Sequence, residues 1–140
     1  MATTAAPYSS VLTLMAASGL NFLTGDAAVC LATNAYTPSQ TGHATLADIT
    51  HELTDASYSR VLLDGKTSVY SAGTLTLDAD DTTFPALVST NIRFAIFAML
   101  GATDADSPLI GYWDLGANQN ANVNDFKLIY HAAGFITITL

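Results

Sequence analysis

Hydrophobic and polar positions follow their clearest pattern in residues 91–100. Read with a period of two, this segment is apolar on both faces: Ile92, Phe94, Ile96, Ala98 and Leu100 on one, and Ala95, Phe97 and Met99, beside Arg93, on the other. A strand that is apolar on both faces is normally covered on both sides, so the pattern predicts the central strand of a sheet. A helix also fits so short a run, but turn residues at 78–81, Pro85 and 104–108 favour the strand.

A second apolar run, residues 109–116, follows at the distance expected for a hairpin. It places Leu109, Trp113 and Leu115 on one face. Gly111 leaves a gap where a backbone segment or a large ring can approach closely. The two runs predict an antiparallel hairpin at the centre of the fold, with residues 78–116 as the segment around which the chain packs.

Four further strands are predicted at residues 27–33, 60–63, 66–70 and 74–77. Asp64-Gly65 lies between two of these runs and predicts a hairpin, because the tight turn needs positive φ. Ala72-Gly73 marks another break before residues 74–77, which alternate cleanly. Residues 39–59 show only a weak pattern and are interpreted as a long loop, which in a compact domain is often a binding arm.

The last part of the chain predicts two more strands. Residues 116–124 are rich in asparagine and predict a turn, and residues 126–130 and 135–140 predict a terminal hairpin through Ala132-Ala133-Gly134. Seven or eight short strands at near-regular spacing are typical of an all-β fold. The predicted architecture is a single antiparallel β-sandwich or jelly-roll-like domain.

The N-terminal segment is predicted to lie outside this sandwich. Residues 1–10 are small and polar and predict a flexible or partner-ordered arm. Ser9 or Ser10 is suited to cap a short helix with an apolar side, and Gly19 to end it. We therefore divide the chain into residues 1–25, an arm and a short helix, and residues 26–140, the sandwich domain.

Charged residues make up only 11% of the 140 residues, against about 25% in ordinary soluble domains. Interfaces between subunits are depleted in charge at their centres, so this composition favours a surface that neighbouring subunits cover. The alternative is a surface rich in threonine, alanine and serine that stays soluble without charge. The sequence alone leaves both open.

The formal net charge of −8 excludes two classes of partner. The four cations, Arg60, Lys66, Arg93 and Lys127, are scattered and form no basic stripe for nucleic acid or for an anionic membrane. The single cysteine, Cys30, excludes an internal disulfide and a cysteine-based metal cluster, and a buried thiol is expected in its apolar strand. A positively charged signal-peptide region is missing, and residues 11–23 are too short and too interrupted for a membrane span.

Two groups of side chains have the ligand types that metals prefer: His43, Asp48, His51 and Glu52, and Asp78, Asp80 and Asp81. The spacing of the first group matches no familiar zinc site. The second lacks the glycine and the distal glutamate of a calcium loop. We therefore expect polar loop residues in the first group and turn caps in the second, and no metal or cofactor.

The sequence offers few candidate catalytic or sugar-binding residues. A serine or cysteine nucleophile needs a histidine held beside it, but His131 lies in the predicted terminal hairpin and no nucleophile-elbow or phosphate-loop motif occurs. The sequence therefore predicts a protein that is not an enzyme. Trp113, Tyr112 and Phe84 have the flat rings of a carbohydrate-stacking platform, although core packing explains them more simply.

Several short segments follow one another in a fixed order along the chain. They are Tyr36-Thr37-Pro38 with His43 and Asp48 downstream, Asp78-Ala79-Asp80-Asp81-Thr82-Thr83-Phe84-Pro85, Arg93-Phe94-Ala95, Pro108-Leu109-Ile110-Gly111-Tyr112-Trp113-Asp114-Leu115-Gly116 and Ala132-Ala133-Gly134-Phe135-Ile136-Thr137-Ile138-Thr139. Taken together, this series resembles a family of small structural proteins of tailed bacteriophages. The likeness runs from about Asp26 to the end of the chain. Phe84 stands where the family commonly has tryptophan, and residues 51–60 depart from its pattern.

The resemblance implies a non-enzymatic virion protein, with a capsid cement or decoration protein as the first expectation. Such a protein is expected on the capsid surface after synthesis in the host cytoplasm, as a homo-oligomer, with a trimer favoured, bound to the major capsid protein. A tail, neck or head-fibre component of the virion is the first alternative. A carbohydrate-binding module for host attachment is the second.

Residues 1–10 and the loop 37–58 are the segments expected to touch other subunits. Arg93 needs a carboxylate or carbonyl partner if it is buried, and Asp114 on the neighbouring predicted strand is the candidate.

Overall fold

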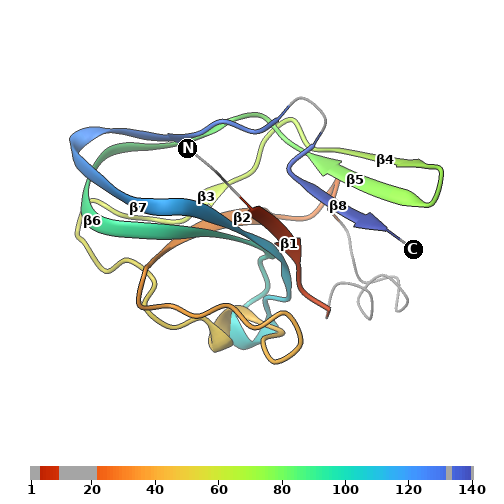
Figure 1. Cartoon of the computed structure of the whole chain (residues 1–140), viewed down its shortest axis with the longest axis horizontal. Coiled ribbons are helices and arrows are strands. Elements are labelled where there is room, and N and C mark those ends of the chain that lie inside the picture. Colours follow the sequence, from red (N-terminus) through yellow and green to blue (C-terminus); the bar gives the residue numbers. More distant parts are fainter. Residues whose placement is uncertain (1–3, 10–21, 132–133, 140) are drawn as a thin grey trace.

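The computed structural model describes residues 4–9, 22–131 and 134–139, and nearly all of its regular structure is β-strand (Figure 1). The strands are β1 (Thr4–Pro7), β2 (Ala27–Thr33), β3 (Val61–Leu62), β4 (Thr67–Ser71), β5 (Thr74–Asp78), β6 (Thr82–Met99), β7 (Leu109–Leu128) and β8 (Ile136–Thr139). Two short 3-10 helices, η1 (Leu46–Asp48) and η2 (Asp104–Asp106), lie in loops. No helix of the described residues is long and apolar enough to cross a membrane.

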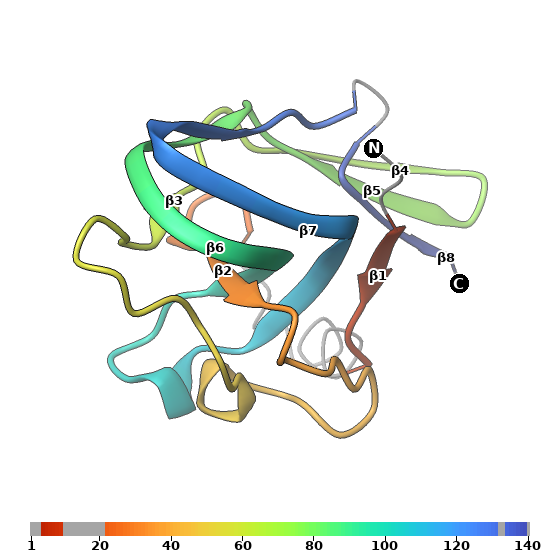
Figure 2. The same ribbon diagram turned by 60° about the vertical axis from the view of Figure 1, so that its left-hand side comes forward.

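The strands form two antiparallel sheets that pack together. The larger has the order β1-β7-β6-β2-β3 and the smaller the order β4-β5-β8. Figures 1 and 2 show β6 and β7 as a long curved ribbon, with the β4–β5 hairpin extending from the opposite side of the molecule. The all-β sandwich-like fold predicted from the sequence is confirmed, and β6 is its central strand.

Both faces of β6 are covered in its second half, from Ile92 to Met99, as predicted. Ala95, Phe97 and Met99 belong to the core cluster between the two sheets, while Phe94 and Ile96 belong to a second cluster on the outer face of the larger sheet. The outer cluster is covered by Tyr8, Tyr36 and Leu46, which come from the N-terminal segment and the long loop. The loop therefore closes one face of the sheet.

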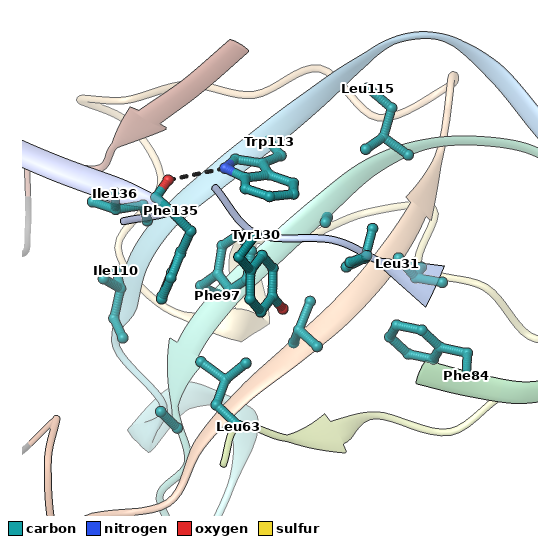
Figure 3. Packing of buried hydrophobic residues seen from close by; sticks show 14 of the residues in the cluster. Leu31, Leu63, Phe84, Phe97, Ile110, Trp113, Leu115, Tyr130, Phe135 and Ile136 are labelled. Carbon is teal, nitrogen blue, oxygen red and sulfur yellow. Dashed lines mark hydrogen bonds between the residues drawn. The ribbon is translucent and has the colours of Figure 1, made fainter. Parts of the chain in front are cut away.

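The centre of the inner cluster is aromatic (Figure 3). The ring of Phe97 lies 4.6 Å from that of Phe135 and 5.9 Å from those of Trp113 and Tyr130, measured between ring centroids. Trp113 donates its indole N–H to the backbone carbonyl of Phe135 at 3.0 Å, which satisfies the one polar atom of the ring. These contacts join the larger sheet to the segment that enters β8.

Two face assignments from the sequence are wrong, for one physical reason. The register between β6 and β7 shifts between Phe97 and Ala98, so that Ile110 is an extra residue and Leu109 turns to the outer cluster instead of sharing a face with Trp113. Against β2, Thr33 pairs with Ile92 and Ala32 with Phe94, so Arg93 is an extra residue and Ile92 turns to the inner cluster. A β-bulge adds one residue and inverts the alternation beyond it.

Gly111 provides the close approach that its sequence position predicts. It pairs with Pro7 of β1, and an added Cβ there would lie 2.8 Å from the carbonyl oxygen of Ala6 and against the side chain of Ile136. The first and last strands of the described chain therefore meet over this one residue.

The prediction of an asparagine-rich turn at residues 116–124 is wrong. The segment lies inside β7, which runs on to Leu128 and pairs with the first half of β6. Residues with positive φ, such as Gly116 (80°) and Asn91 (58°), bend the ribbon at register shifts instead of ending it. The Asn120 side chain accepts a hydrogen bond from the backbone N–H of Asn91 at 3.0 Å, so turn-forming residues here stabilise bulges.

Two predicted hairpins are also wrong. Asp64-Gly65 connects β3 in the larger sheet to β4 in the smaller one, and the actual hairpin turn of β4–β5 is Ala72-Gly73. Gly65 has the positive φ (59°) expected of it, but Asp80 packs against it and holds the chain as a crossover between sheets. The predicted terminal hairpin fails because residues 126–128 pair with β6 whereas β8 pairs with β5.

The N-terminal arm differs from its prediction where the structure describes it. Residues 4–7 form β1 and pair with β7 at the edge of the larger sheet, with Ala6 opposite Tyr112. Tyr8 follows with its side chain fully buried, so this segment is part of the fold instead of a separate arm. The short helix predicted after Ser10 lies outside the described residues.

Candidate interaction surfaces

The four residues of the first group of metal candidates make separate contacts and do not converge on one point. The Nδ1 atom of His43 lies 2.9 Å from the hydroxyl of Tyr36, and the Asp48 carboxylate accepts backbone N–H groups of Ala44 and Thr45 at 2.8 and 3.0 Å. These two backbone hydrogen bonds lower the pKa of Asp48. His51 contacts its neighbour Thr50. Within the described residues, no three His, Cys, Asp or Glu side chains group closely enough to hold a metal ion.

Glu52 belongs to a polar cluster that fastens the loop to the sheet. Arg60 donates to both oxygens of Glu52, at 2.8 and 2.7 Å, and to Asp104 at 2.8 Å. Tyr58 donates its hydroxyl to Glu52 at 2.7 Å and accepts the N–H of Leu31 at 3.0 Å. The hydrogen bonds that Arg60 donates to Glu52 and Asp104 raise the pKa of Arg60 and lower the pKa of Asp104. The cluster holds the loop in place.

A chain of hydroxyl groups anchors the N-terminal segment to the same loop. The hydroxyls of Tyr8 and Tyr36 lie 2.8 Å apart, and Tyr36 continues the chain to His43. Burial raises the pKa of both tyrosines. Gln40 donates to the carbonyl of Pro7 at 2.8 Å. The two segments that we expect to contact other subunits therefore hold each other in position.

The acidic residues of the second group act as turn caps in part. Asp78 accepts the N–H of Ala79 at 2.9 Å, and Asp81 accepts the N–H of Tyr130 at 2.9 Å. Asp80 packs against Gly65. The capping interpretation from the sequence is confirmed for Asp78 and Asp81.

The candidates for covalent chemistry and sugar stacking do not assemble into a site. Cys30 is fully buried, and burial raises its pKa to about 12. Phe84 and Trp113 are only 2% and 7% exposed, and both belong to the inner cluster. Tyr112 packs on the outer face, with its ring 5.4 Å from that of Tyr8. The three rings therefore form no common platform.

The Arg93–Asp114 pair predicted from the sequence is confirmed. Both nitrogens Nε and Nη2 of Arg93 donate to the carboxylate of Asp114, the second at 3.2 Å. This bond lowers the pKa of Asp114, and the N–H of Gly116 adds to the effect. Both side chains remain partly exposed, so the pair fixes the ribbon at a register shift and forms no buried charged site.

An open groove of about 380 Å³ lies between the long loop and β6. It is lined by Thr33, His51, Glu52, Leu53, Thr54, Asp55, Ser89 and Thr90. The carboxylate of Glu52 already accepts hydrogen bonds from Arg60 and Tyr58. The carboxylate of Asp55 is exposed and makes no hydrogen bond or ion pair among the residues described. The groove therefore presents hydroxyl groups, the imidazole of His51 and the carboxylate of Asp55 to an incoming polar group.

The most exposed strand of the described residues, β4, lies outside the segments that are expected from the sequence to contact other subunits. All five residues of β4 are exposed, including Val69 (59%) and Tyr70 (65%). Other exposed large apolar residues are dispersed over the described surface: Leu23, Leu62, Val88, Val123 and Ile129. The segment Thr-Ser-Val-Tyr-Ser carries no repeated apolar position, as expected of an edge strand with neither face in a core.

Comparisons with protein-family models, curated proteins and solved structures found no match to this chain.

Proposed function

We propose that this chain is a non-enzymatic structural subunit of a bacteriophage virion, a cement or decoration protein of the capsid shell. In this proposal it self-associates, and its long loop contacts the major capsid protein. The mechanism is mechanical: each copy adds weak contacts between shell subunits, and repetition around a symmetry axis multiplies them.

The observation that carries the structural role is the exposure of β4. A single domain that leaves a whole strand and two large apolar side chains in water presents a surface suited to another chain. The low charge content supports the same conclusion, because only 11% of residues are charged. Neither observation points to a phage by itself.

The virion assignment rests on the sequence resemblance. Its segments fall on structural positions: the turn that follows β2, the link from β5 to β6, the centre of β6, the first half of β7, and β8. Phe94, Trp113 and Ile136 within them are buried. The similarity therefore concerns residues that build the fold, and it supports a shared architecture more than a shared contact surface.

We assign the loop 37–58 to the shell contact. It carries most of the groove, and the Arg60 cluster and the Tyr8–Tyr36 pair hold it against the sheet. A loop that is already ordered loses little conformational entropy when it binds. Asp55 supplies a carboxylate for a cationic group of the neighbour, which suits a chain of net charge −8.

Purified particles of the phage that encodes this chain provide the test. We expect the chain in the particles, in a number that is in step with the capsid subunits, and on the head surface by particle imaging. A few copies at one vertex or along the tail would contradict the decoration role and support the tail, neck or head-fibre alternative. Complete absence from particles would overturn the virion assignment.

A carbohydrate-binding role remains the second alternative from the sequence. The burial of Trp113 and Phe84 removes the platform that suggested it. A glycan-array screen of the purified chain, with no binding expected, separates this role from the proposed one.

A further inference from the structure

The outer side of β4 meets no other strand of the described chain, because β4 is the first strand in the order β4-β5-β8. We propose that this edge binds the same edge of a second copy, so that the two smaller sheets join into one continuous antiparallel sheet. The inference deepens the self-association in the proposed function and rests on that proposal for its biological setting.

The hairpin turn determines which backbone groups the edge offers. Ala72 and Gly73, with φ of 51° and 82°, form a two-residue loop between the paired residues Ser71 and Thr74. Such a loop is closed by a hydrogen-bonded pair, and hydrogen-bonded and non-bonded pairs then alternate along the ladder. Ser68 and Tyr70 therefore turn their N–H and C=O groups away from β5 and toward the free edge.

A two-fold axis through Val69 satisfies these groups. It places Val69 opposite Val69 of the second copy, and Ser68 opposite Tyr70 of that copy on both sides. Each Ser68–Tyr70 pair then exchanges two N–H···O=C bonds, in the same way as a hydrogen-bonded pair inside a sheet. The two Val69 residues form the non-bonded pair between them, where Cα atoms approach to about 4.5 Å.

Nothing on β4 opposes such pairing. Natural edge strands are usually protected by proline, a charged residue or a bulge, and Thr67–Ser71 contains none of these. The chain carries a net charge of −8, so most contacts between two copies bring carboxylates together. Residues 65–77 contain no acidic side chain and one cation, Lys66, so β4 itself brings no carboxylate to the contact, and Asp78 lies one strand away, opposite Thr67.

A row of apolar side chains explains what a second copy gains beyond hydrogen bonds. Tyr70 pairs with Leu75, and Leu75 pairs with Ile138 across the smaller sheet. Ile138 is buried, Leu75 is half-buried and Tyr70 is 65% exposed. The row therefore runs from the core to the surface, and its last side chain, Tyr70 on β4, is exposed to solvent. A second copy extends the sheet beyond Tyr70 and brings its own row alongside.

The geometry has a consequence for the oligomer. A two-fold contact produces a dimer, whereas the sequence resemblance favours a trimer. The pairing of two five-residue edges makes a small contact, so we expect a dimer that dissociates on dilution and that becomes stable when copies are concentrated on a particle.

The first experiment changes residue 69 and measures the solution mass by light scattering at several concentrations. The wild-type chain should approach twice its 14.6 kDa mass at high concentration. Val69→Lys places two ammonium groups opposite each other at the axis and should halve that mass. Val123→Lys, at a valine that is 64% exposed on β7, should remain dimeric. A wild-type monomer or trimer, or a dimer that Val69→Lys leaves intact, would overturn the proposal.

The second experiment does not depend on a loss of association. Residues in a non-bonded antiparallel pair are close enough for a disulfide, and Cys30 is buried and does not compete. Val69→Cys should form a covalent dimer under mild oxidation, while Val123→Cys should remain monomeric on a non-reducing gel. Equal cross-linking of both variants, or of neither, contradicts the β4 pairing.

The two proposals can fail separately. Particles that contain the chain although Val69→Cys gives no cross-link would retain the virion role and remove the edge pairing. A cross-linked dimer that is absent from particles would retain the edge pairing and remove the virion role.

Discussion

At the residue scale, the charged side chains of this protein serve the fold. Arg60 and Arg93 each hold carboxylates that fix a loop or a register shift. Asp48, Asp78 and Asp81 cap backbone N–H groups. A chain with so few charges uses many of them internally, which leaves its surface poor in charge and suited to contact with other chains.

The Arg93–Asp114 pair predicts how stability depends on pH. The pKa of Asp114 is lower in the folded chain than its ordinary value of 3.8, so its contribution is complete above that value and is lost as the pH falls through the folded pKa. We expect the free energy of unfolding to fall in acid below about pH 4. Asp114→Asn should flatten this dependence, measured by urea unfolding across a pH series.

Arg93→Gln removes the other partner and should give the same flattening. An unchanged acid dependence in both variants would mean that the pair contributes nothing to stability, as many exposed ion pairs do.

At the element scale, irregular positions decide how the strands pair. The bulge at Ile110 turns Leu109 outward, and positive φ at Asn91 and Gly116 bends the β6–β7 ribbon. Gly111 lets β1 and β8 approach the same point of β7. The sheet is therefore held together at a few places where an ordinary alternating strand would not fit.

Gly111→Ala tests the closest of these approaches. The new Cβ would meet the carbonyl oxygen of Ala6 and the side chain of Ile136, so backbone must move. We expect a loss of about 1–3 kcal/mol in the free energy of unfolding, and faster hydrogen exchange in β1. Gly42→Ala is the control, since its Cβ would meet only the short side chain of Ser39, which can rotate away without a movement of the backbone, and it should change stability by less than about 0.5 kcal/mol. Equal effects of the two substitutions would contradict this account.

At the scale of the whole molecule, one aromatic cluster joins the two sheets. Phe97 from β6 contacts Trp113, Tyr130 and Phe135, and Phe135 leads directly into β8. The sandwich should therefore unfold as one cooperative unit, and the single tryptophan of the chain reports on its centre.

Phe97→Ala should lower the free energy of unfolding by about 3–5 kcal/mol, because it leaves a cavity where both sheets meet. Tryptophan fluorescence and far-ultraviolet circular dichroism should shift to lower urea concentration together. Val123→Ala, at an exposed valine, should leave both transitions in place. A fluorescence transition that separates from the dichroism transition would mean that the sheets unfold independently.

The alternation of apolar and polar residues was sufficient to predict the structure where a strand is regular. It predicted the all-β fold, the inner strand at residues 27–33, the central strand with both faces buried, and the Arg93–Asp114 pair. These properties depend on the alternation of side chains along one strand and on its immediate neighbour, and both are present in the local sequence.

The tertiary structure decided which strands pair and where regular pairing is interrupted. Asp64-Gly65 and Ala72-Gly73 are both competent turns, but only the second joins two strands of one sheet. The segments 126–130 and 135–140 are predicted from the sequence to pair with each other, yet residues 126–128 pair with β6 and residues 136–139 pair with β5. Local sequence sets the conformation of a turn, whereas the choice of partner strand depends on which apolar faces must be covered by residues far away in the chain.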